Sequence, residues 1–190
     1  MLIGGYSLYE LFLQFLFWGV AGWLVEVVDM KIEVGEFQNR GFLHVPLCPL
    51  YGIGMPVLCI LLGDAKKSYL AIFIGGVVFC TVVEYIIGWL LEKLFNARWW
   101  DYSHMRFNFQ GRICLRNAIL FGFGAMLSLG FVQPVLEGTI HRIPAQIGMA
   151  VITVVALALV IDVTASVFRA LRYRREHRDG DAVVLFKSHR

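Results

Sequence analysis

Charged residues are scarce in this sequence, and the common catalytic motifs are missing. Only 16% of the 190 residues are charged, against about a quarter in average soluble proteins. The chain has no P-loop GxxxxGK[ST], no GxSxG elbow, no HExxH zinc site and no Ser-His-Asp arrangement. These absences exclude ATP hydrolysis by a known motif and argue against the usual hydrolases.

The four cysteines show neither CxxC nor zinc-type spacing, so neither a disulfide framework nor a zinc cluster is indicated. Cys48 and Cys114, with His44, are the remaining candidates for a metal or thiol site. His44 and Cys48 have the spacing of helical neighbours, but Pro46 between them interrupts such a helix. Because cysteine is also an ordinary small residue of packed interiors, we favour that interpretation and expect no metal and no cofactor.

Long apolar runs dominate the sequence. The sequence is 58% hydrophobic with a mean hydropathy of +0.69, too apolar for one water-soluble core of this length. A hydrocarbon layer of about 30 Å needs roughly 20 helical residues to cross it. The sequence therefore predicts an all-α, polytopic membrane protein of about five transmembrane helices, located at Ser7–Val28, Leu43–Leu62, Tyr69–Leu91, Ile113–Val132 and Ile143–Phe168.

The first apolar run is predicted to remain in the mature protein. It is as long as a full span, has no basic region before it, and contains Glu10 and Glu26, which is not typical of a signal peptide.

Lysine and arginine predict the orientation, because these residues are retained on the cytoplasmic side. Alternate loops differ strongly in their cations. One side receives Lys31, Arg40, Lys93, Arg98, Arg106, Arg112, Arg116, Arg169, Arg172, Arg174, Arg175, Arg178, Lys187 and Arg190; the other receives Lys66, Lys67 and Arg142. We expect a bacterial cytoplasmic membrane protein with its N-terminus outside, a transmembrane domain over 1–168 and a basic cytoplasmic tail over 169–190. The net charge of +3 then reflects topology and contact with anionic lipid headgroups rather than nucleic acid.

The second crossing is predicted to be broken. Pro46, Pro49 and Pro56 interrupt it, and only about 12 residues after Pro49 look helical, roughly 18 Å of rise. Such backbone survives at membrane depth only against protein or a water-filled cavity. We expect Gly41–Tyr51 to be non-helical but buried, with a half-helix beginning near Pro49.

Glu84 is the first candidate for a functional side chain, because a carboxylate deep in a span is costly unless it is paired, hydrated or protonated. Gly76, Cys80, Glu84 and Gly88 share one narrow helical stripe, which lets another helix approach closely. We expect Glu84 to lie near Asn39, Arg40, Arg112 or the amides of the half-helix.

The first helix repeats the pattern with Gly19, Gly22 and Glu26, and the last has Asp162, Ser166 and Arg169 at similar spacing. For Glu26 and Asp162, a snorkelling or salt-bridged packing role is the alternative.

The segment NARWWDYS follows a predicted helix end. Trp99, Trp100 and Tyr102 fit an aromatic belt at the membrane interface. Asp101, placed among these rings, is expected to pair with Arg112 or to cap the short segment after it.

Three segments together resemble a known family: FQNRGFLHVPLCPLYGIG, TVVEYIIGWLLEKLFNARWWDYS and NFQGRICLRN. They are similar to signature blocks of the bacterial family named putative ABC-transporter type IV, with departures at His44, Val45 and Asn117. The resemblance covers roughly Trp18 to Pro134. It implies a permease-like membrane protein whose site residues match the family pattern at Asn39, Arg40, Tyr51, Glu84, Trp99, Trp100, Asp101, Tyr102, Asn108 and Arg112, and a possible separate ATPase subunit.

Three functions remain open from the residues alone. In the first, a small permease or channel moves an ion or polar solute along a path lined by Glu26, Glu84 and the half-helix. In the second, a membrane-embedded enzyme or lipid-binding protein holds a phospholipid headgroup with Arg40, Arg112, Asp101 and the tryptophans. In the third, the chain assembles with another membrane protein. The small-residue stripes also favour a homo-oligomer.

The two halves of the sequence have a similar order of features. Each runs from an acid, Glu26 or Glu84, through a polar loop to a Gly/Arg pair and then a cysteine. This order suits two parallel two-helix repeats, as in some small transporters.

Overall fold

The computed structural model describes residues 2–35, 41–63, 68–176 and 183–184. Five helical segments make up most of it: α1 (Leu8–Val34), α2 (Pro49–Leu61), α3 (Tyr69–Phe95), the continuous helix from α4 (Leu115–Leu127) to α5 (Gln133–Ile140), and α6 (Ala145–Glu176). The strands are two-residue pairs, so the all-α prediction is confirmed. They are β1 (Leu2–Ile3) with β2 (Tyr6–Ser7), β3 (Ala97–Arg98) with β6 (Val183–Val184), and β4 (Asn108–Phe109) with β5 (Ile113–Cys114).

Within the described residues, four helices are long and apolar enough to cross a membrane: Leu8–Ile32, Tyr69–Phe95, Leu115–Ile140 and Ala145–Arg175. The fifth, α2, has 13 residues and would rise only about 20 Å. Pro49 is at its first turn, as predicted, where its missing N–H costs nothing. The chain before it is non-helical up to Cys48 but only partly buried, with Leu43 and Leu47 inside and His44 and Pro46 exposed.

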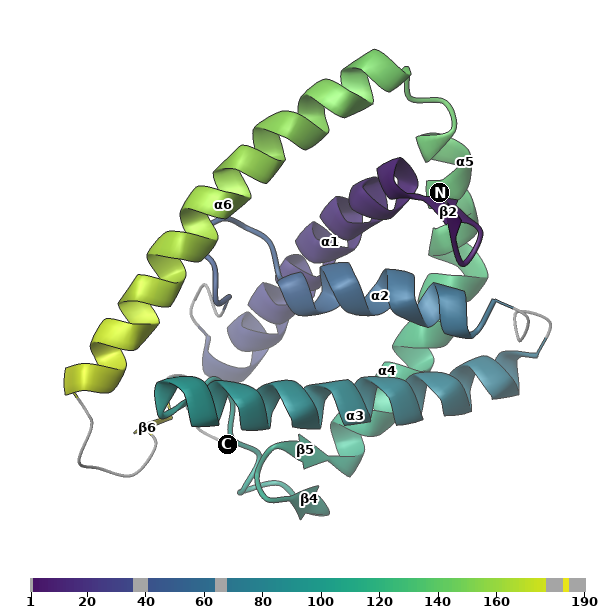
Figure 1. Ribbon diagram of the computed structural model, residues 1–190. Helices are drawn as coiled ribbons and strands as arrows, with labels where there is room; N and C mark the ends of the chain where they lie inside the picture. Colours follow the sequence, from purple (N-terminus) through teal and green to yellow (C-terminus); the bar gives the residue numbers. More distant parts are fainter. Residues whose placement is uncertain (1, 36–40, 64–67, 177–182, 185–190) are drawn as a thin grey trace.

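Local signals explain where the long helices begin and end. Ser7 and Glu10 form a reciprocal capping box at the start of α1, and Gly35 ends that helix in the left-handed conformation. Ser68 caps the start of α3, and Asn96, also left-handed, ends it. Residues 128–132 form a π-helical turn, η2 (Ser128–Val132), so that α4 and α5 continue as one span without a break in the chain direction (Figure 1).

The helices pack as two pairs. α1 packs mainly against α2, and α3 mainly against α4. In each pair a 27-residue helix is followed by a helix that starts at a cysteine N-cap, Cys48 before α2 and Cys114 before α4, but α2 ends after 13 residues whereas α4 continues into α5. The repeat suggested by the order of acids, arginines and cysteines stays a prediction.

Glycines make these close contacts possible. A Cβ added to Gly22 would lie 2.4 Å from the Cβ of Tyr51 in α2, and one added to Gly76 would lie 2.4 Å from the Cβ of Ala125 in α4. The small-residue stripes predicted from the sequence therefore serve helix pairing within one chain. The homo-oligomer stays a prediction.

The last helix, α6, runs along one side of the other helices (Figure 1) and meets them along one narrow face. Gly148 lies against Tyr9 near the start of α1, and Ala170 packs with Phe95 and Ala97 at the end of α3. Much of the remaining surface of α6 is exposed and apolar, as Leu157 and Ile161 illustrate, which is what lipid contact requires.

Candidate functional site

Two glutamates lie near the end of the bundle where α1 and α3 finish, and each accepts a hydrogen bond from a tyrosine. Tyr51 Oη, on the first turn of α2, donates to Glu26 Oε1 of α1 at 2.9 Å. Tyr102 Oη, in the connection after α3, donates to Glu84 Oε1 at 3.0 Å. Glu84 is only 6% exposed. Two acids from different helices are thus held by neutral hydroxyl donors.

The two pairs lie within electrostatic range of each other through Tyr51 and Tyr102, and Cys48 lies within that range of Glu26. Glu84 interacts in this way with Cys80 and Cys114. We call Glu26, Tyr51, Glu84 and Tyr102 the inner polar site.

Arg112 binds a different acid from the one proposed as its partner. Its Nη2 donates to Glu92 Oε2 at 2.8 Å, and its Nη1 donates to Gln110. Arg98 binds the same Glu92 carboxylate through Nε and Nη2, at 3.0 and 3.2 Å. Glu92, which sequence reasoning missed, therefore joins two arginines at the end of α3. Glu92 and Arg98 lie on either side of a helix end and are close in the sequence, and this spacing could have indicated that they form a pair.

The connection from 97 to 114 is folded by its own side chains. Ser103 N and Oγ both donate to Asp101 Oδ1, so the capping role expected for Asp101 is confirmed; its ion pair is with Arg98, at 3.9 Å. Partial burial alone would raise the pKa of Asp101, but the bonds from Ser103 and the charge of Arg98 hold it below its ordinary value. Asn108 donates to Met105 O at 2.7 Å and accepts from Gly111 N at 3.1 Å.

Only glycine suits position 111, which has φ of +69° and faces Ser103 and Asp101 at distances that a Cβ would not permit.

The predicted interface aromatics have partners within the protein. Trp99 packs with Phe42 and Phe95, at ring-centroid distances of 5.8 Å. Trp100 Nε1 donates to Arg112 O at 2.8 Å. Trp100 and the Arg112 guanidinium thus have hydrogen-bond partners within the protein, and the alternative in which they hold a lipid headgroup stays a prediction.

The segment before α2 is attached to α6 through Asp162. This buried carboxylate accepts hydrogen bonds from His44 N at 2.9 Å, from Val45 N at 2.9 Å, and from the His44 ring at 2.6 Å. Ser166 also contacts His44 Nδ1, while Arg169 lies 3.0 Å from His44 Nε2 and donates to Phe42 O.

Serine and aspartate contact the same ring nitrogen of His44, so this is not the geometry of a catalytic triad. No group of three or more His, Cys, Asp or Glu side chains that could hold a metal occurs among the residues that the structure describes. Asn39 and Arg40 lie outside the described residues.

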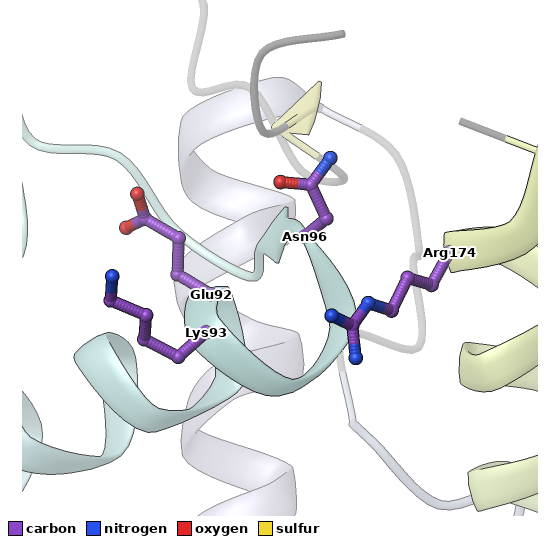
Figure 2. Close-up of a pocket in the computed structure, with 4 residues that line it drawn as sticks. All are labelled: Glu92, Lys93, Asn96 and Arg174. Atoms are coloured by element: carbon purple, nitrogen blue, oxygen red, sulfur yellow. The ribbon is translucent and has the colours of Figure 1, made fainter. Parts of the chain in front are cut away.

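A cavity of about 260 Å³ lies where the end of α3 meets α6 (Figure 2). Glu92, Lys93, Asn96 and Arg174 line it. Arg174 reaches from α6 and donates to Leu94 O at 3.0 Å. Its positive charge therefore lies at the C-terminal, negative end of the α3 dipole, where a cation is stabilising. Glu92 is already bound by two arginines. The cavity is part of the junction between α3 and α6, and its lining residues are separate from the inner polar site.

The helices and their apolar surfaces define a multi-pass membrane protein of the all-α class. A family model described as "Putative ABC-transporter type IV" matches residues 13–167, and the chain belongs to this family. The resemblance seen in the sequence is thereby confirmed. Neither the curated proteins nor the solved structures contain a match to the chain.

Proposed function

We propose that the protein is a permease of the bacterial cytoplasmic membrane that moves an ion or small polar solute through the inner polar site. The observation that carries this proposal is the pair of glutamate–tyrosine contacts, one between α1 and α2 and one between α3 and the connection that follows it. An acid at membrane depth is costly and usually functional, and here one of the two acids, Glu26, is bound by a tyrosine on the first turn of a short, proline-started helix. Discontinuous helices of this kind form the ion and substrate sites of many transporters.

The chemistry of the site favours a cation or a solute that donates hydrogen bonds. Glu26 and Glu84 present carboxylate oxygens, and a tyrosine hydroxyl can rotate to accept as well as donate. A solute with N–H or O–H groups could exchange with the tyrosines as the partner of each acid, at little cost in hydrogen bonds.

Glu84→Gln tests this proposal, because it keeps the shape of the side chain and removes its charge. The protein is reconstituted into vesicles, and the flux of protons, Na⁺, K⁺ and methylammonium is measured separately. The flux of the transported probe should fall roughly tenfold or more, the equivalent of losing a hydrogen bond to a charged group. Equal flux in the variant and the parent, or no flux of any probe in the parent, would refute the proposal.

A tyrosine pair supplies the matched control. Tyr102→Phe removes the hydroxyl that donates to Glu84, and we expect a loss of flux in the same direction. Tyr85→Phe makes the same chemical change where the hydroxyl contacts exposed Gln110, and should leave the flux unchanged.

The family description also suggests an ATPase partner, which would have to be a separate chain because this sequence has no P-loop. Copurification of an ATP-binding subunit, and flux that requires ATP, would identify the chain as the membrane subunit of an ABC transporter. Flux from the chain alone would identify an autonomous carrier.

A further inference from the structure

A second polar cluster lies at the opposite end of the bundle, where the sequence showed no candidate. Gln133 is fully buried at the start of α5. Its Oε1 accepts from Trp18 Nε1, and its Nε2 donates both to Gln14 Oε1 and to Glu137 Oε1, each at 3.0 Å. Tyr6, in the N-terminal hairpin, also donates to Glu137 Oε1. Gln14, Gln133 and Glu137, with Trp18 and Tyr6, are here called the outer cluster.

The outer cluster and the inner polar site share α1 but lie at opposite ends of it. Gln14 and Glu26 are twelve residues apart, or about 18 Å along the helix axis. The two polar regions are thus separate sites on one membrane-spanning helix.

Two donors of the outer cluster converge on one side-chain oxygen of Glu137. An indole N–H can only donate, so Trp18 fixes the Gln133 amide with its oxygen toward the indole and its nitrogen toward Gln14 and Glu137. Tyr6 donates to the same carboxylate oxygen. Two donors converging on one oxygen bind a carboxylate more strongly than a neutral carboxylic acid.

The cluster also has features of a network with a second arrangement. Gln14 Nε2 is buried without an acceptor among the residues that the structure describes, so another arrangement that satisfies it would be favoured. The π-helical turn η2 immediately precedes Gln133, and such turns are frequent at functional sites. Pro134 follows and removes one donor from the helical ladder.

We propose that Glu137 is a proton-binding site. Proton uptake at Glu137 releases the outer end of the permease, and proton loss closes it. A proton from the aqueous phase forms an O–H bond on the Glu137 carboxylate and returns to water on release. Uptake neutralises the acceptor shared by Tyr6 and Gln133, which weakens the attachment of the N-terminal hairpin and of α1 to α5. The role in transport rests on the proposed function; the proton binding itself does not.

Other titratable groups surround the cluster and must be distinguished from Glu137. Glu10 of α1 lies 3.0 Å from the exposed His141 at the end of α5. Cys59 of α2 is within electrostatic range of Tyr6. Tyr9 of α1 lies between this cluster and Gly148 of α6.

The indole N–H of Trp18 provides a direct measurement. In the full-length protein in lipid nanodiscs, with ¹⁵N-labelled tryptophan and the Trp18 signal assigned by Trp18→Phe, pH is varied from about 4 to about 9. We expect the Trp18 signal to titrate in the parent and not in Glu137→Gln. Glu10→Gln should still titrate.

A tyrosine pair tests the site even if Glu137→Gln does not fold. Tyr6→Phe removes a donor to the ionised carboxylate, so the midpoint should move to higher pH by about one unit. Tyr9→Phe removes a hydroxyl that has no partner in the described part of the chain and should leave the midpoint unchanged. A loss of stability alone would not produce this difference.

Three results would overturn the proposal: no titration in the parent, titration that persists in Glu137→Gln but disappears in Glu10→Gln, or the same midpoint in Tyr6→Phe and the parent.

Repeating the titration in Glu84→Gln separates the two hypotheses, because proton uptake at Glu137 should persist there even though flux is lost. In the parent, an imposed proton gradient should accelerate solute flux, and in Glu137→Gln it should not.

Discussion

At the scale of single residues, the acids named here, all in the described part of the chain, accept from three kinds of donor. Glu84 and Glu26 accept from tyrosine hydroxyls, Glu92 from two arginines, and Asp162 from backbone amides and a histidine ring. The sequence identified Glu84 by its depth in an apolar run, and Glu26 and Asp162 by their spacing with other residues on one helix face. It could not identify their partners, because Tyr102, Tyr51 and His44 are brought to them only by folding.

Asp101 gives a prediction of pH dependence. Its pKa in the folded protein lies below the ordinary value, so its stabilising effect is present above about pH 4 and is lost as pH falls through the folded-state pKa. Asp101→Asn should lower the melting temperature near neutral pH, and the gap to the parent should narrow in acid. Thermal unfolding followed across this pH range measures the effect.

Ser103→Ala is the companion variant, since it removes one of the two donors to Asp101 and should give a smaller gap of the same pH dependence. A gap that stays constant from neutral to acidic pH would contradict this account of Asp101.

At the scale of elements, α6 is joined to the broken crossing by a few polar contacts rather than by a broad apolar interface. Asp162, Ser166 and Arg169 lie on one face of α6 and bind the segment 42–45, which leads into α2. That segment in turn sets the start of the half-helix that carries Tyr51. The spacing of these three residues was visible in the sequence, but their target was not.

Asp162→Asn should therefore detach this segment from α6. The substitution removes the charge that three donors share, and hydrogen bonds to charged groups contribute about 1.5–3 kcal/mol each; we expect a loss of at least about 2 kcal/mol in unfolding free energy. Thermal or denaturant unfolding in detergent measures it, and the reactivity of Cys48 toward a maleimide should rise.

The control for this variant is Thr164→Val, on the exposed face of the same helix, where the hydroxyl bonds only to Val160 O. It should unfold like the parent. Unchanged stability in Asp162→Asn would show that the apolar contacts of α6 suffice to hold it.

At the scale of the whole molecule, the distribution of cations leads to a topology that can be measured. We expect Arg190 in the cytoplasm and Lys66 and Lys67 outside, because the basic residues cluster in the loops and tail of one side. Reporter fusions after Arg190, and labelling of a cysteine introduced at Lys66, test this in intact cells. Labelling from the opposite sides would reverse the assignment of the inner polar site and the outer cluster.

The class of the protein was determined by the sequence alone, because each span must satisfy its backbone internally and be apolar over about 20 residues, both of which are local properties. Pro49 likewise set the start of α2 through its own missing N–H. The polar sites were decided by tertiary structure. Gln14 and Gln133 are 119 residues apart, and neither is unusual in its local sequence. Only packing of α1 against α5 places them together in a buried environment. A polar side chain is tolerated there only if it forms a hydrogen bond.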